Sequence, residues 1–152
     1  MRSICLLFIL SIIVTVGGLP AAAQQSGVRS LNTDPEKVKV VSSDIDLFWK
    51  AYDKARPDNN INVFRDEYIR KGSIGLKDFT TTRIGSACGL VEVIEARPKY
   101  YASLRETSLK AAGFQEPMRA AFRKLKSIYP DAVFPDVYLM IGKMNSGGTY
   151  TE

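Results

Sequence analysis

Residues 44–53 read DIDLFWKAYD, and this stretch decides how the chain begins to fold. Large apolar side chains recur in it at positions i, i+3, i+4 and i+7, which places them on one face of an α-helix. They are Ile45, Phe48, Trp49 and Tyr52. We therefore expect a helix that begins after Ser43, ends before Pro57 and carries three aromatic rings on one face.

Asp44, Asp46 and Asp53 lie on the same predicted helix. The first two are well placed for the positive end of the helix dipole. Carboxylates on a helix face are usually solvated, so we expect all three to contact water rather than to form a site.

A second amphipathic helix is predicted before Gly72. Its outward face has i,i+4 pairs from Asp66 to Arg70 and from Glu67 to Lys71. Its apolar residues are Ile61, Phe64, Tyr68 and Ile69.

Further along, glycines bound a short segment at 76–84, and helical patterns resume at 87–96, at 100–112 up to Gly113, and at 118–128. The expected fold is therefore mainly α, with a subdomain of five to six helices across residues 38–130.

The segment before the first helix has two interpretations. Residues 24–37 are expected to be a linker, and Val38, Val40 and Val41 form a β-branched, alternating patch that predicts a short extended segment. Residues 33–36, TDPE, also have the form of a capping box that opens a helix. We favour the extended segment.

The sequence pattern changes from helical to extended in residues 131–152. Residues 133–142, VFPDVYLMIG, predict a strand, and residues 145–149, NSGGT, predict a turn. A hairpin is expected to begin here without its second strand, so this region would start an incomplete α+β domain with an aggregation-prone edge. Deleting residues 137–152 is then expected to raise solubility while the helical signal persists.

Residues 1–23 have the form of a signal peptide. A positive start at Arg2 precedes an apolar run at 4–16, and small residues lead to a cleavage site after Ala23. The alternative is a membrane anchor, but a run of about 13 residues is short of the roughly 20 that span a bilayer. We expect export to a bacterial periplasm or beyond, without a lipid or membrane anchor after cleavage.

Composition excludes several kinds of chemistry. The 152 residues contain no His, which rules out Ser-His-Asp triads, Cys-His pairs and the common zinc sites that use histidine. The net charge of +5 is too mild to argue for nucleic acid. After cleavage Cys88 is the only cysteine, so no internal disulfide forms, and we expect this thiol to be a small core residue.

Two weak signals for binding remain. The glycine-rich turn at 145–149 could cradle an anion with its N–H groups, but it lacks the known phosphate-loop spacings, so turn geometry explains it better. A basic set interleaved with tyrosines is a weak nucleic-acid signal, which the export signal argues against. Its members are Arg83, Arg97, Lys99, Tyr100, Tyr101, Arg105 and Lys110.

Four segments of the sequence match the motifs of a known family in the same order. They are DIxxFWKAYD at 44–53, GSxGLxxF at 72–79, YYASxR at 100–105 and YPxAxFPxVYxxIGxxNSGGT at 129–149. Together they resemble the domain-of-unknown-function family of predicted secreted zinc-dependent proteases related to gliding-motility lipoprotein B of Bacteroidetes. The resemblance covers about residues 38–149. The residues that match the family motifs are scaffold: Phe48, Trp49, Tyr52, Asp53, Tyr138, Asn145, Ser146, Gly147, Gly148 and Thr149.

The resemblance implies a helical amino-terminal part that leads into a zincin-like region, whose HExxH helix binds zinc further on. No catalytic residue or metal ligand can be carried over, so we expect no cofactor in this chain and zinc only in a full-length parent. Either the chain is a truncated part of such a parent, or it is complete and the helical part acts differently. The unfinished hairpin favours truncation.

Two functional hypotheses follow. The first is the non-catalytic, amino-terminal portion of an exported bacterial zinc-protease-like protein, inactive by itself. The alternative is a free-standing periplasmic helical module that binds a peptide or an envelope partner. Its aromatic groove would consist of Trp49, Tyr52, Tyr100 and Tyr101, although helical spacing favours a core role for these rings.

Overall fold

The computed structural model describes residues 31–56 and 58–150. The signal peptide expected at 1–23 and residues 24–30 of the expected linker lie outside this part. The elements, in chain order, are η1 (Pro35–Lys37), β1 (Val40–Val41), α1 (Ser43–Ala55), α2 (Ile61–Val63), η2 (Phe64–Ile69), α3 (Ile74–Phe79), η3 (Thr80–Ile84), α4 (Ala87–Ala96), α5 (Pro98–Leu109), η4 (Lys110–Phe114), α6 (Gln115–Ile128) and β2 (Val137–Tyr138). The mainly helical fold class is confirmed.

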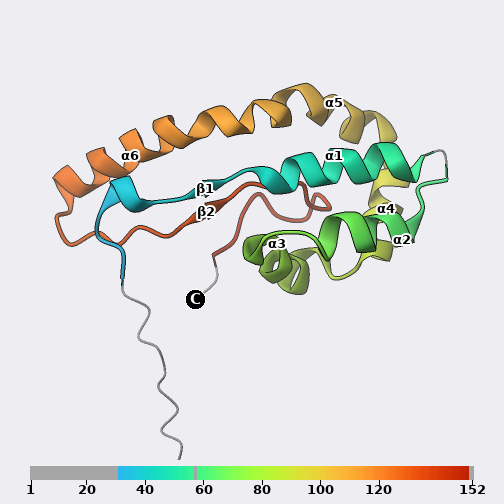
Figure 1. The fold of residues 1–152 in the computed structure, drawn as a ribbon, viewed down its shortest axis with the longest axis horizontal. Helices are drawn as coiled ribbons and strands as arrows, with labels where there is room; N and C mark the ends of the chain where they lie inside the picture. Colours follow the sequence, from blue (N-terminus) through green and yellow to red (C-terminus); the bar gives the residue numbers. More distant parts are fainter. Residues whose placement is uncertain (1–30, 57, 151–152) are drawn as a thin grey trace, which may run out of the picture.

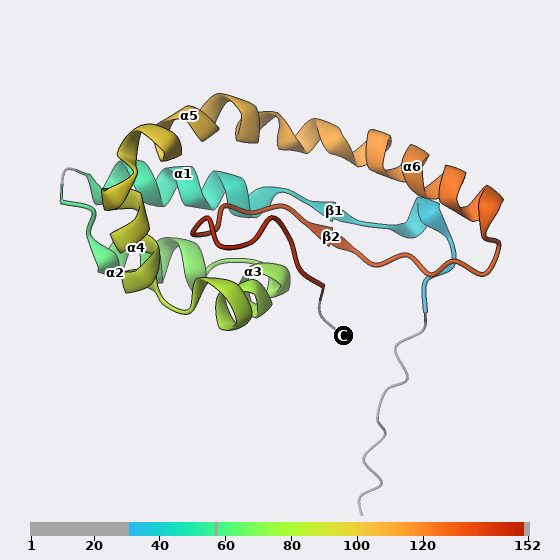
Figure 2. The same cartoon turned by 180° about the vertical axis from the view of Figure 1, so that it is seen from behind.

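The helices lie on both sides of α1 and the short sheet. Figures 1 and 2 show α5 and α6 as one long arc along one side of α1 and β1. The shorter helices α3 and α4 lie on the opposite side, and the chain that follows β2 runs between α1 and α3. This arrangement brings β2 and the residues just before it into contact with the beginning of the described chain.

Helix α1 (Ser43–Ala55) ends before Pro57, as its pattern predicts, and begins one residue earlier than predicted. Its apolar face forms the centre of the main core, where Phe48 is fully buried and Trp49 is 3% exposed. The ring of Phe48 makes both T-shaped and stacked contacts with the aromatic rings around it. Its centroid lies 5.0 Å from that of Trp49 and 5.3 Å from that of Tyr68, both in T-shaped contacts. These aromatic pairs add specific packing to the buried area.

The expected solvation of Asp44 is wrong, since this carboxylate is fully buried. Its Oδ1 accepts a hydrogen bond from the backbone N–H of Ser73 at 2.8 Å, and its Oδ2 accepts one from the Ser73 hydroxyl at 2.5 Å. The same hydroxyl caps α3 by accepting from Leu76 N at 3.2 Å. Burial is tolerated because the carboxylate is hydrogen-bonded, and it ties α1 to the start of α3.

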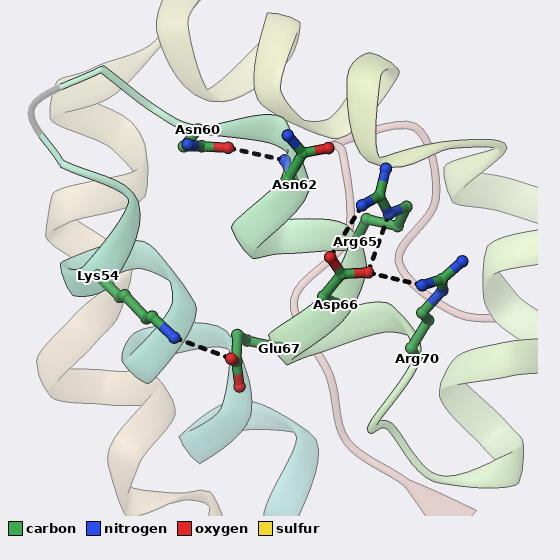
Figure 3. A network of polar contacts seen from close by, with 7 residues as sticks. All are labelled: Lys54, Asn60, Asn62, Arg65, Asp66, Glu67 and Arg70. Carbon is green, nitrogen blue, oxygen red and sulfur yellow. Dashed lines mark hydrogen bonds and ion pairs between the residues drawn. The ribbon is translucent and has the colours of Figure 1, made fainter.

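The second predicted helix is formed by α2 and by η2, which has π-helical geometry. The Glu67–Lys71 and Asp66–Arg70 pairs are both present. Figure 3 shows Asp66 between Arg65 and Arg70, and Glu67 reaching Lys54 of α1 at 2.8 Å. Two lysines lower the pKa of Glu67 to about 2. These pairs are exposed, so each contributes little stability.

The unpaired strand expected near the end of the chain is also wrong. β2 pairs with β1 in parallel, in the register Val40 with Val137 and Val41 with Tyr138. The expected extended segment at 38–41 is therefore its partner, and η1 realises the competing helical turn just before it, capped by Asp34. A parallel pair needs a long crossover connection, which no pattern within a few residues reveals.

Gly113 does not end a helix. The chain passes through it in η4, a 3₁₀ turn, and continues directly into α6 at Gln115, before the predicted start at Met118. A Cβ at Gly113 would meet nothing within 4 Å, so no close contact requires glycine here. The arc of α5 and α6 crosses from the main core to a second, smaller core formed by Val38, Ala132 and Phe134.

Cys88 is exposed, so its predicted place in the core is wrong. It lies on the outer side of α4, whose inner side carries the buried residues Ala87, Leu90, Val91 and Ile94. The Cys88 thiol lies 3.4 Å from Glu92 Oε1, and this hydrogen bond raises the thiol pKa. A thiol that is held protonated is a poor nucleophile.

Candidate functional site

The segment that follows β2 is held inside the protein by the hydroxyl of Tyr68. This side chain is fully buried, donates a hydrogen bond to Ile141 O at 2.7 Å and accepts one from Ile141 N at 3.2 Å. One hydroxyl thus replaces both backbone contacts that a neighbouring strand would make. Burial raises the pKa of Tyr68, so the hydroxyl keeps the proton that it donates.

Tyr101 on α5 holds the next residue of the same segment. Its hydroxyl donates to Gly142 O at 2.9 Å, and burial raises the pKa of Tyr101 to about 12. A Cβ at Gly142 would lie 2.8 Å from Cε1 of Phe79, so only glycine allows this close approach. Two tyrosines from different helices therefore fix the path of residues 141–142 between them.

A groove of about 290 Å³ lies where this clamped segment passes α5. Its lining residues are Tyr100, Leu104, Thr107, Ser108, Met140, Ile141, Gly142, Met144 and Ser146. Tyr100 and Met144 are each 42% exposed at its surface. The lining has apolar and hydroxyl groups, so the groove is suited to hold an apolar side chain.

The structure separates the four residues of the expected aromatic groove. Trp49, Tyr52 and Tyr101 are buried, and only Tyr100 reaches the surface, so the aromatic groove is wrong and the core interpretation of these three is confirmed. Trp49 is fixed by a hydrogen bond from Nε1 to Ser108 Oγ at 2.9 Å.

The methionines and Leu104, which line the groove that does exist, were missed from the sequence. Their place depends on α5 meeting a segment about forty residues later in the chain. No local pattern contains that information.

Asp53 and Arg105 form an exposed link between α1 and α5. The guanidinium donates two hydrogen bonds to the carboxylate, at 2.7 and 2.6 Å, and lowers the pKa of Asp53. The same guanidinium lies 5.1 Å from the centre of the Trp49 ring. Asp53, a residue of the family-like motif, therefore positions Arg105 over the indole rather than facing a cavity.

The glycine-rich turn is attached to η3. Asn145 Nδ2 donates to Arg83 O at 2.6 Å, and Arg83 Nη2 lies 3.5 Å from Thr149 Oγ1. Within the turn, the Ser146 hydroxyl donates to Gly148 O at 2.7 Å. No second strand follows the turn within the described residues.

Tyr138 lies apart from the turn, on β2, where its side chain packs directly against Gly75 of α3. The motif residues are therefore in four places: the core, the exposed pair of Asp53 with Arg105, β2 and the turn. None of them converges on a cavity with the others.

Among residues 31–56 and 58–150, no group of three or more His, Cys, Asp or Glu side chains is arranged to hold a metal ion. In the same residues no helix is both long enough and apolar enough to cross a membrane. Comparisons with protein-family models, with curated proteins and with solved structures give no match.

Proposed function

We propose that this chain is the non-catalytic helical part of an exported bacterial protein of the zinc-protease-like kind that its motifs resemble. Its role in this proposal is to hold β2 and the turn after it as the fixed edge of a larger sheet. The observation that carries the proposal is that β2 is clamped on one side and open on the other.

The clamped side of β2 is hydrogen-bonded to β1, and the tyrosines hold residues 141–142 that follow it. Val137 N donates to Lys39 O and Leu139 N donates to Val41 O, both at 2.8 Å. Because the N–H groups of successive strand residues point in opposite directions, those of Tyr138 and Val40 point to the two outer edges of the sheet. A two-stranded sheet with only two residues in each strand is marginal alone, and a further strand would use these free groups.

The first experiment concerns the gene. We expect an in-frame continuation beyond the codon of Glu152 that encodes HExxH within about one domain length. Zinc uptake by the 152-residue chain should be negligible, and the longer product should bind one zinc per chain. Tight stoichiometric zinc binding by the 152-residue chain contradicts the proposal, and so does a natural stop codon directly after Glu152.

Hydrogen exchange tests the scaffold role independently of zinc. In the longer product the amide of Tyr138 or of Val40 should become protected, because one of these edges receives a strand. The amide of Leu139, bonded to β1 in both proteins, is the internal control. Equal exchange of Tyr138 and Val40 in the short and long chains would show that no strand is added at either edge.

The groove beside Tyr100 favours a second candidate function, the binding of an apolar side chain from a peptide or envelope protein. Methionine-rich surfaces adapt to several partners, which suits this lining. The methyl signals of Met140 and Met144 should shift on titration with N-acetyl-tryptophan amide, whereas those of the exposed Ile74 on α3 should not, and Tyr100→Ala should weaken the effect. An equal response of Ile74 and the two methionines would refute a specific site.

A further inference from the structure

The net charge of the described chain is concentrated on one part of it, residues 98–133, here called the arm. The arm comprises α5, η4, α6 and the five residues that follow. It contains seven Lys or Arg and three Asp or Glu, a net charge of +4. The other described residues contain twelve of each sign, so their net charge is zero. Two of the arm's cations, Arg105 and Arg123, are paired with Asp53 and Glu36 outside it. With these two carboxylates included, the arm still has a net charge of +2, which favours an acidic partner over a basic one.

The arm also exposes apolar side chains out of proportion to its length. Seven of the twelve exposed large apolar residues lie on it, although it is less than a third of the described chain. They are Tyr100, Leu109, Phe114, Leu125, Ile128, Tyr129 and Val133. Ile128 is 73% exposed and Leu125 is 45% exposed, and both lie on α6, a helix without a single buried residue. Exposed apolar clusters of this kind mark interaction surfaces.

The exposed residues of α6 are part of a regular stripe. Phe114, the last residue of η4, is followed on α6 by Met118, Ala121, Leu125 and Ile128. The spacings are 4, 3, 4 and 3, those of the a and d positions of a heptad repeat. Such a stripe is one side chain wide and faces a single partner helix.

The neighbouring side of α6 is already occupied. Phe122 packs there against Phe134, with ring centroids 5.2 Å apart. Arg119 and Lys126, on the same side, donate to the carbonyls of Val38 and Thr33. The stripe, apart from the half-buried Met118, is therefore the part of the apolar face that the fold leaves uncovered.

We infer that the stripe on α6 docks an acidic amphipathic helix of another polypeptide. Lys124 flanks Leu125 and Ile128 on the solvent side and makes no ion pair in the described part of the chain, so it is free for a carboxylate of the partner. A second copy of this chain is disfavoured because two arms that each have a net positive charge repel each other. A lipid surface is disfavoured because a membrane-surface helix needs a broad apolar face, and half of this face is covered. The inference does not depend on the proposed function.

The test uses the purified protein and a synthetic 21-residue helical peptide with leucine at a and d and glutamate at e and g. Its matched control is the same peptide with lysine in place of glutamate. Fluorescence anisotropy at about 50 mM and about 300 mM salt should show binding of the acidic peptide that weakens with salt. The basic peptide should not bind.

Two variants probe the site and two control it. Ile128→Ser and Lys124→Glu should each raise the Kd of the acidic peptide roughly tenfold. Ile74→Ser and Lys77→Glu, on α3 away from the arm, should leave the Kd unchanged. Ile74 is 59% exposed and Ile128 is 73% exposed, so neither Ile→Ser substitution disturbs a core.

Three results would overturn the inference. The first is equal or absent binding of the two peptides. The second is a dimer in sedimentation equilibrium that Ile128→Ser dissociates, which would assign the stripe to a second copy. The third is binding to phosphatidylglycerol vesicles through Lys124 and Ile128 without binding of the peptide, which would assign it to a lipid surface.

Discussion

Replacing Tyr68 with Phe removes a single oxygen atom from the centre of the protein. The ring remains, so its contacts with Phe48 and the rest of the core are kept. What is lost is the hydroxyl that serves both the N–H and the C=O of Ile141. The change therefore isolates the polar part of the clamp from its apolar part.

The expected cost follows from burial. Ile141 is only 6% exposed, so water does not readily replace the missing partner. A buried backbone group without a hydrogen bond costs about 1 to 3 kcal/mol, and two such groups are created here. Partial relaxation reduces their sum, and we expect Tyr68→Phe to lower the free energy of unfolding by about 2 to 4 kcal/mol.

Tyr101→Phe is the matched comparison. It removes one hydrogen bond, to the carbonyl of Gly142, which lies at a half-buried position beside the groove. Water can reach this carbonyl, so the expected loss is only about 1 kcal/mol.

Urea unfolding followed by circular dichroism gives both free energies, and hydrogen exchange of the Ile141 amide reports the clamp directly. The reasoning about Tyr68 is refuted if its variant loses no more than the Tyr101 variant does. It is also refuted if the Ile141 amide stays protected in Tyr68→Phe.

Three further predictions concern packing and pH. Trp49→Ala, at a side chain 3% exposed, should cost about 3 to 5 kcal/mol in urea unfolding. Gly75→Ala should cost about 1 to 3 kcal/mol, because its Cβ would lie within 2.7 Å of three Tyr138 atoms, whereas Gly113→Ala should be neutral or stabilising. The pKa of Tyr101 is raised to about 12 in the fold, so its contribution to stability is complete below about pH 10 and is lost as the pH rises towards 12. Ultraviolet titration measures the pKa, and unfolding at the same pH values measures the stability.

Deleting residues 137–152 is expected from the structure to have the opposite effect on solubility to the one predicted from the sequence. The sequence predicts higher solubility, because it shows a strand without a partner. The structure places Val137 beside Val40 and Ile141 in the main core, so deletion would expose β1 and leave Tyr68 without its hydrogen bonds. We now expect the deleted chain to lose cooperative unfolding and to aggregate.

Local pattern was sufficient for the helices. The 3.6-residue periodicity of Ile45, Phe48, Trp49 and Tyr52 specifies both the helix and the face that it buries, since both are properties of neighbouring residues. The two i,i+4 pairs around Asp66 and Glu67 follow from helix geometry in the same way. Boundaries such as Gly113 failed because glycine permits a helix to stop but does not require it.

Long-range contacts were decided only by the tertiary structure. The pairing of β1 with β2 joins residues 97 apart, the Tyr68 clamp joins residues 73 apart, and Asp44 is buried by Ser73 from 29 residues away. The sequence by itself determined which side chains are apolar and on which helix face they lie. Whether a face is covered, as on α1, or left open, as on α6, depends on packing between distant segments, and no local periodicity records it.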